Sequence, residues 1–217
     1  LLLRERAEAG SAARLLFMPL SPSDWSPSDA IARFVAKWEG YASRWYQDSA
    51  GVPTIGYGVT EPALRAIGLR TDTVPVPLRR EQALTLLDEL LVAEYAPAVA
   101  DAVTTERAQY EYDALLSFCY NVGPSALRRS SLLSAVNAGA GRDRIGAEWM
   151  RWVYAGGKVL RGLVRRRRAE LHWYQGRPKQ ARSHGYEPVD VAAIEPVDPA
   201  ELESLDVDID YTPDLPQ

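Results

Sequence analysis

The hydrophobic period of this chain changes once near its start, and that change constrains the fold more than any other feature. One apolar helix face is expected from residues spaced i, i+3, i+4 and i+7, namely Ile31, Phe34, Val35 and Trp38. Ser26 can cap this helix, Pro27 suits its first position and Asp29 favours the positive end of its dipole. Gly40 should end the helix, which makes Glu39 its last side chain.

The period then switches to aromatic and β-branched residues between Trp45 and Gly58, around a turn at residues 49–51. This pattern predicts a small β-hairpin. The two strands would carry Asp48 and Thr54.

Helical periodicity dominates the rest of the chain. Residues 80–103 predict one long helix, with Pro97 as a kink or break, and this helix could bridge two lobes. Further helices are expected over residues 105–121, 130–138, 143–152 and 163–175. The expected fold class is therefore α+β, mostly α, with a small sheet lobe joined by a long helix to an all-helical lobe.

This organisation predicts three parts of the chain. A helical extension and connector come first, a folded domain follows, and an acidic, proline-containing tail comes last, over residues 1–25, 26–176 and 177–217. Within the domain we expect the small lobe, the linking helix and the helical lobe over 26–78, 79–103 and 104–176.

Charge is unevenly distributed along the 217 residues. Residues 187–217 carry ten acidic side chains and no Lys or Arg. Removing those ten from the 29 acidic residues leaves 19 against 25 basic ones, so residues 1–186 have a net charge of +6. A basic body suits an anionic polymer, but charge alone does not distinguish a cell-wall polymer from nucleic acid.

The single cysteine, Cys119, excludes an intramolecular disulfide. No run approaches eighteen apolar residues, and charged side chains interrupt the first twenty positions, so we expect neither a signal peptide nor a membrane span. The chain begins with Leu rather than Met, which leaves open a processed product or a piece of a longer polypeptide. His172 and His184 lack neighbours at metal-ligand spacing, so no metal and no other cofactor is expected.

Glu39, Asp48 and Thr54 together suit the cleavage of a glycosidic bond. That reaction needs a protonated acid at the leaving oxygen and a second group for the attacking water or the positive charge on the sugar. The helix end and Trp38 would disfavour the charged form of Glu39, which makes it the expected proton donor. Asp48 should stay ionised near a polar turn, and Thr54 could position the water. Taken singly, each residue is an ordinary capping or solvated side chain.

The segments around these residues resemble a known family. The run from Glu39 to Gly58 is similar to the active-site signature of phage-type lysozymes, glycoside hydrolase family 24. Later segments resemble the helical lobe of endolysins in that family: Asp113–Gly123, Ser131–Leu133, Asn137–Gly139 and Arg151–Glu170. The similarity extends from about Ile31 to Tyr174.

The resemblance implies a lysozyme-like fold and a muramidase that hydrolyses the β-1,4 bond between N-acetylmuramic acid and N-acetylglucosamine. Glu39, Asp48 and Thr54 match the catalytic Glu, Asp and Thr of the family, which generally works by inversion. Two positions depart from the pattern: Val59 stands where a His is common, and Ser43 where a Leu is common.

Five further residues are predicted to bind substrate on the strength of the resemblance: Tyr57, Gly58, Tyr120, Asn121 and Ser131. Aromatic faces and amides suit sugar rings and N-acetyl groups. Tyr120 equally suits core packing on its helix. The run from Arg165 to Arg168 could form a solvated basic face, but a structural role, with some attraction to wall polymer, is favoured.

The expected partner is bacterial cell-wall peptidoglycan rather than nucleic acid, with phage virion or holin-system proteins as further candidates. The chain is expected to act as a monomer without stable membrane insertion, in the host cytoplasm before release to the wall, or in a virion. A lytic transglycosylase and a non-catalytic wall-binding or virion module remain alternatives. The acidic tail could fold back on the basic body, dock on a phage structural protein, or serve only as a solubilising segment.

Overall fold

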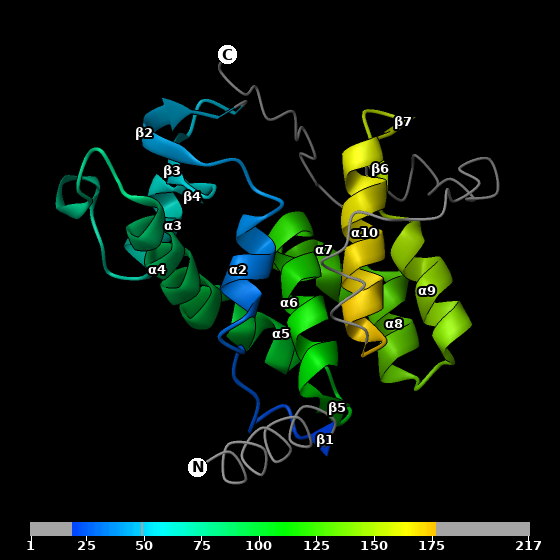
Figure 1. The fold of residues 1–217 in the computed structure, drawn as a ribbon. Helices are drawn as coiled ribbons and strands as arrows, with labels where there is room; N and C mark the ends of the chain where they lie inside the picture. The colour runs from blue at the N-terminus through cyan, green and yellow to red at the C-terminus, as the bar shows by residue number, and fades with distance from the viewer. Residues whose placement is uncertain (1–18, 49, 177–217) are drawn as a thin grey trace, which may run out of the picture.

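A computed structural model describes residues 19–48 and 50–176 and is mostly helical, with small sheets (Figure 1). The expected α+β, mostly α fold class is confirmed. The helix expected over residues 1–20 lies outside the described residues except for Pro19 and Leu20, which form strand β1. The acidic tail lies outside them as well.

The largest sheet has three antiparallel strands in the order β2-β3-β4, covering Ala42–Gln47, Pro53–Gly56 and Val59–Thr60. The sequence predicted only the first two strands. Gly56 and Gly58 have φ angles of 68° and 79°. Such angles favour glycine and let the chain turn back into the third strand. Asp48 was predicted to lie in a strand but instead follows β2 in the turn, whereas Thr54 lies in β3 as expected.

A small apolar core lies under this sheet. Ile55, Val59 and Leu64 of helix α3 are fully buried there, and Leu86 and Leu90 of helix α4 are buried in the same core. Helix α3 covers Glu61–Ala66, a 3-10 turn follows at Thr71–Thr73, and α4 covers Arg80–Leu90. The short helix α3 was not predicted; Thr60 caps it by accepting a hydrogen bond from the backbone N–H of Ala63 at 3.4 Å.

The long helix expected over residues 80–103 forms, but Pro97 does not break it. Helix α4 continues through a π-helical turn at Leu91–Tyr95 into α5, Ala96–Ala102. The N–H of Ala96 bonds to the carbonyl of Leu91, five residues back. Pro97 therefore falls in the first turn of α5, where a missing N–H donor costs little.

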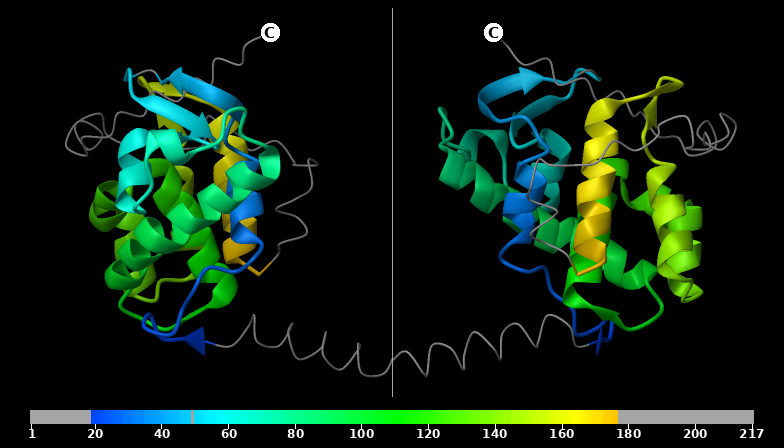
Figure 2. Two further views of the ribbon diagram at one scale, coloured as in Figure 1. Left: turned by 90° about the vertical axis from the view of Figure 1, so that its left-hand side faces the viewer. Right: turned by 45° about the vertical axis from the view of Figure 1, so that its right-hand side comes forward.

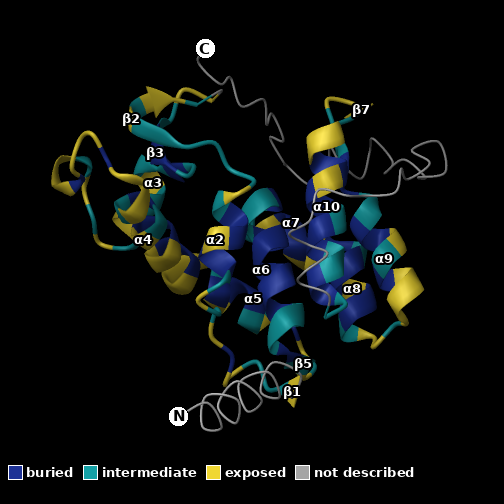
Figure 3. Ribbon diagram, in the orientation of Figure 1, coloured by how far each residue is buried: buried dark blue, intermediate teal, exposed yellow. Residues whose placement is uncertain are grey.

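Helix α6, Gln109–Val122, runs through the larger core, and the last helix, α10, Arg161–Tyr174, packs along it (Figures 1 and 2). Buried residues concentrate on these two helices (Figure 3). Around them lie α7, α8 and α9, which cover Pro124–Arg129, Ser131–Asn137 and Arg142–Met150. The hairpin of β6 and β7, Tyr154–Ala155 and Lys158–Val159, leads into α10. The sequence missed α7 and this hairpin.

Residues 19–25 are part of the folded body. Strand β1, Pro19–Leu20, pairs with β5, Arg107–Ala108, and Trp25 stacks on Tyr112 at a centroid distance of 4.6 Å. Because Arg107 and Ala108 pair in this strand, α6 begins at Gln109 and not near residue 105.

Helix α2 covers Ile31–Ala36 and buries Ile31, Phe34 and Val35 in the larger core, although the sequence grouped it with the small lobe. The prediction that Ser26 caps this helix is wrong, since α2 starts at Ile31 without a side-chain cap. The backbone N–H of Ser28 instead donates to the buried carboxylate of Asp113 at 3.2 Å, which holds the preceding turn against α6.

Candidate active site

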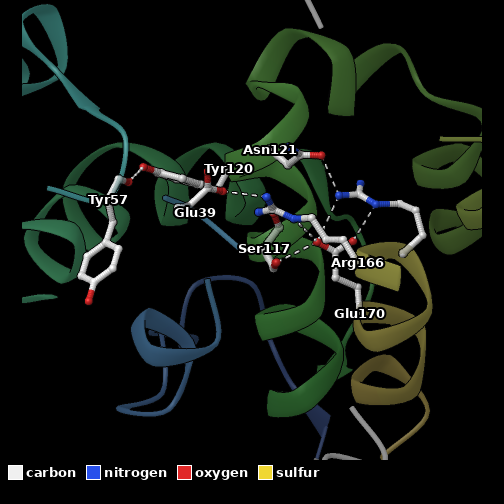
Figure 4. A network of polar contacts seen from close by, with 8 residues as sticks. Glu39, Tyr57, Ser117, Tyr120, Asn121, Arg166 and Glu170 are labelled. Atoms are coloured by element: carbon white, nitrogen blue, oxygen red, sulfur yellow. Dashed lines mark hydrogen bonds and ion pairs between the residues drawn. The ribbon is translucent and has the colours of Figure 1, made fainter. Parts of the chain in front are cut away.

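Glu39 lies in a bend three residues beyond the end of α2, and is not the last helical side chain as predicted. The helix ends early because the N–H of Trp38 bonds to the carbonyl of Val35 at 2.8 Å, in a turn. The side chain of Glu39 is 7% exposed, and its Oε1 accepts a hydrogen bond from Nη1 of Arg166 at 2.6 Å (Figure 4). A buried charge pair therefore fixes the direction of this carboxylate.

Arg166 ties Glu39 to the helical body. Its Nε donates to Glu170 Oε1 at 3.1 Å and its Nη2 to the backbone carbonyl of Ser117 at 3.3 Å. Burial alone would lower the pKa of Arg166, but the negative charges of Glu39 and Glu170 outweigh burial and raise it. The guanidinium stays charged throughout the biological pH range.

Glu170 is the second anion of this cluster and is fully buried. It accepts from the hydroxyl of Ser117 at 2.8 Å (Figure 4). It also accepts from the indole N–H of Trp149 at 3.0 Å and pairs with Arg167. The solvated basic face considered for residues 165–168 is thus wrong for Arg166 and Arg167, which are both buried. The helical spacing of Leu163, Arg167 and Glu170 was the signal that could have placed them on the buried face.

Gly58 and Tyr120 lie beside Glu39. The hydroxyl of Tyr120 donates to the backbone carbonyl of Tyr57 at 2.9 Å. A Cβ atom added to Gly58 would stand 3.5 Å from that hydroxyl and 3.9 Å from Oε2 of Glu39. The Tyr57 ring points away from Glu39 in Figure 4 and packs on Tyr41 at a centroid distance of 5.4 Å. The backbone at 57–58, more than the Tyr57 ring, therefore faces the carboxylate.

Asp48 and Thr54 are both held by the β2–β3 turn. Oδ1 of Asp48 accepts from the backbone N–H groups of Ala50 and Val52, at 3.0 and 2.8 Å. The hydroxyl of Thr54 donates to the carbonyl of Val52 at 3.0 Å, and Thr54 is 2% exposed. Asp48 itself is half-buried in this turn.

The amino-acid sequence from the end of α2 into α10 matches a known protein family. A family model described as phage lysozyme matches residues 36–170. The chain belongs to the phage lysozyme family. That range contains every predicted catalytic and substrate-binding residue, and it also contains Arg166, Arg167 and Glu170, whose contact with Glu39 the sequence did not predict.

Similar proteins agree with this family assignment. An endolysin of Bacillus phage B103 is 33% identical over 148 residues, which cover 66% of this chain and 51% of that protein. The chain thus spans about half the length of this relative. The muramidase domain of SpmX from Asticaccaulis excentricus has a TM-score of 0.58 at 29% identity, covering 69% of this chain and 97% of that one. A variant of P22 lysozyme has a TM-score of 0.58 at 27% identity, covering 70% and 99%. The lysozyme-like fold expected from the resemblance is confirmed.

Two of the residues predicted to bind substrate contact other parts of the helical lobe. Oδ1 of Asn121 accepts from Nη2 of Arg167 at 2.7 Å, so its amide carbonyl is committed to the buried cluster. The hydroxyl of Ser131 donates to Glu148 on α9 and lies 3.4 Å from Nη1 of Arg151. Their predicted contact with glycan stays a prediction.

One of the two departures from the family pattern has a local explanation. Val59 is fully buried in the small core beside Ile55, where an apolar side chain packs without needing a polar partner. The carbonyl of Ser43 accepts from the N–H of Leu78 at 2.8 Å, a backbone contact that any residue could make, and the structure does not explain the Ser side chain.

Neither a metal cluster nor a membrane helix occurs in the part of the chain that the structure describes. No group of three or more His, Cys, Asp or Glu side chains within residues 19–48 and 50–176 is arranged to bind a metal ion. Over the same residues, no helix combines the length and apolar character needed to cross a bilayer.

Proposed function

We propose that this chain is a peptidoglycan hydrolase that cleaves the β-1,4 bond between N-acetylmuramic acid and N-acetylglucosamine. The observation that carries the proposal is the placement of Glu39. Its carboxylate is almost buried, is oriented by Arg166, and has Oε2 next to the backbone of Gly58. Membership of the phage lysozyme family supports the same activity.

Glu39 is the proposed proton donor to the leaving oxygen. The expectation from the sequence relied on the helix end and on Trp38, and it missed Arg166 as the side chain that contacts this carboxylate. Arg166 is shared between Glu39 and Glu170, so its charge is not committed to Glu39 alone. Its proposed role is to hold the carboxyl group in one orientation while a proton enters from solvent and is passed to the sugar.

Asp48 is the proposed partner on the other side of the scissile bond. Two backbone N–H groups donate to Oδ1 and fix the direction of this carboxylate, which suits activation of water or stabilisation of positive charge at the sugar. Thr54 is the proposed positioning residue, because its hydroxyl is fixed by Val52 and can still accept a hydrogen bond from water. The proposed substrate-binding residues are Tyr57, Gly58, Tyr120, Asn121 and Ser131.

The wider role that we propose is bacterial wall lysis by a phage-encoded enzyme. The B103 relative is an endolysin, which supports this role. The proposed places of action are the host cytoplasm before release to the wall, or a virion, with a holin system or virion proteins as partners and the chain acting as a monomer.

The test is Glu39→Gln against wild type on purified bacterial cell walls. This change keeps the side-chain volume and removes the transferable proton, so release of new reducing ends should fall by about a hundredfold or more. Glu89→Gln is the matched control, since Glu89 is exposed on α4 and should retain full activity. Circular dichroism checks that both variants fold. A folded Glu39→Gln chain with wild-type activity would exclude Glu39 as the acid.

A further inference from the structure

Tyr46 is the one aromatic side chain among the large hydrophobic residues that the described ranges leave exposed. It is 46% exposed and lies on strand β2, two residues before Asp48. The other two such residues, Val76 and Val92, are aliphatic. An exposed tyrosine ring next to a proposed glycosidase site raises the question of what it contacts.

The strand register shows which face of the sheet carries this ring. Tyr46 pairs with Thr54 across β2 and β3, and directly paired residues point to the same face. Ile55, the next residue along β3, points to the opposite face, where it is fully buried in the small core. Tyr46 and Thr54 are therefore on the face of the sheet that turns away from the small core.

Asp48 lies on that same face. Its backbone N–H bonds to the carbonyl of Val52 at 3.0 Å, which continues the β2–β3 pairing beyond the end of the strand. Side chains two residues apart on an extended strand point to the same side. The sheet thus presents the Tyr46 side chain on the same face as Thr54, its cross-strand partner, and Asp48, two residues further along the chain.

Both proposed catalytic carboxylates act on this phenol. Burial raises the pKa of Tyr46, and the negative charges of Asp48 and then Glu39 raise it further. The hydroxyl therefore remains protonated at neutral pH and is available as a hydrogen-bond donor.

We propose that Tyr46 is a saccharide-binding residue: its ring packs against the apolar face of a pyranose next to the cleaved bond, and its hydroxyl donates to that sugar. The inference rests on the proposed function, because it assigns part of the substrate contact in the same site. Amphipathic aromatic side chains suit this task, since the ring gives a flat apolar surface and the phenol a polar end.

The alternative is that Tyr46 only stabilises the sheet through its cross-strand contact with Thr54. The two roles separate in a split between KM and kcat on soluble glycan strands freed of stem peptides. Tyr46→Ala should raise the apparent KM about tenfold, as expected for loss of one aromatic contact, while kcat changes by less than about twofold. Tyr46→Trp keeps an aromatic face and should stay within about threefold of wild type.

Val92→Ala is the matched control, because Val92 is exposed to a similar extent, 49%, on the π-helical turn. It should change neither kinetic constant. If Tyr46→Ala does not stay folded at the assay temperature, Tyr46→Leu keeps an apolar side chain in the sheet, lacks the aromatic face, and should show the same rise in KM.

The inference is overturned if a folded Tyr46→Ala or Tyr46→Leu chain has the KM of wild type, or if only kcat falls. Failure of the proposed function would look different: the wild type itself would leave the strands intact. In that case, binding of the same strands is measured by tryptophan fluorescence for the wild type and the Tyr46 variants. Weaker binding by the variants still supports the saccharide contact, and equal binding, or none by the wild type, rejects it.

Discussion

Replacing Glu170 by Gln should destabilise this protein far more than its small change in shape implies. The carboxylate is fully buried and pairs with two buried guanidinium groups, Arg166 and Arg167. Its two oxygens also accept from Ser117 and Trp149. A glutamine presents one oxygen and one NH2 group, so one set of these donors would face another donor.

The magnitude follows from the charge balance of the cluster. Glu39 and Glu170 together balance Arg166 and Arg167. In the variant, two buried cations would share one anion, which typically costs about 3–5 kcal/mol. The melting temperature of a domain of this size falls by roughly 2–4 °C per kcal/mol, so a fall of about 6–20 °C is expected. Burial already lowers the pKa of Arg167 to about 10, and Glu170 is the strongest influence that opposes this effect, so loss of the Glu170 charge leaves the buried Arg167 cation poorly stabilised.

The assay is thermal unfolding followed by circular dichroism, with Glu148→Gln as the matched comparison. Glu148 is likewise buried and paired with two arginines, but Arg144 and Arg151 have side chains 68% and 29% exposed. Water can solvate those cations when the carboxylate is neutralised, so the Glu148 variant should lose less than half as much stability. Equal losses in the two variants would refute the argument that burial of the guanidinium groups sets the cost.

Two further changes test other parts of the fold. Burial raises the pKa of Asp113 to about 6, although hydrogen bonds from Ser28 and Gln109 act to lower it. The carboxyl group of Asp113 is therefore still protonated in the folded state at pH values where it is already ionised in the unfolded chain. Stability attributable to this group is therefore highest at low pH and falls as pH rises from about 4 to about 6, by on the order of 3 kcal/mol. Asp113→Asn should flatten this dependence in urea unfolding measured at several pH values, and an unchanged slope would contradict the assignment. Trp25→Ala should cost about 3–5 kcal/mol, because it empties the site against Tyr112. A melting temperature within about 2 °C of wild type would instead mean that residues before 26 do not contribute to the core.

Local sequence patterns predicted the helices and strands whose formation depends on residues close by in the sequence. The apolar face from Ile31 to Val35, the strands around residues 49–51 and the helices α6, α8, α9 and α10 follow from hydrophobic period and turn residues. The predicted first residues of helices were less accurate where a contact with a residue far away in the sequence determines the start of the helix. The N–H of Ser28 bonds to Asp113, 85 residues away, and no local pattern carries that contact.

The candidate site shows the same division. The spacing of Glu39, Asp48 and Thr54 was readable from the family resemblance, and the structure brings Gly58 and Tyr120 to Glu39. The partner of Glu39 was not readable, because a structural role expected for the arginines at 165–168 does not show which of the four is buried or which carboxylate it contacts. Only the packing of α10 against α6 shows that two of the four are buried with Glu170.

The most direct test of the central claim is analysis of the products that wild-type protein releases from purified peptidoglycan in water enriched in oxygen-18. If Glu39 protonates the leaving oxygen and water completes the reaction, each new N-acetylmuramic acid end should carry one oxygen-18 atom, and Glu39→Gln should release almost none. Anhydro ends without the label would show that the chain is a lytic transglycosylase. Absence of any cleavage product from a folded wild-type chain would contradict the hydrolase itself.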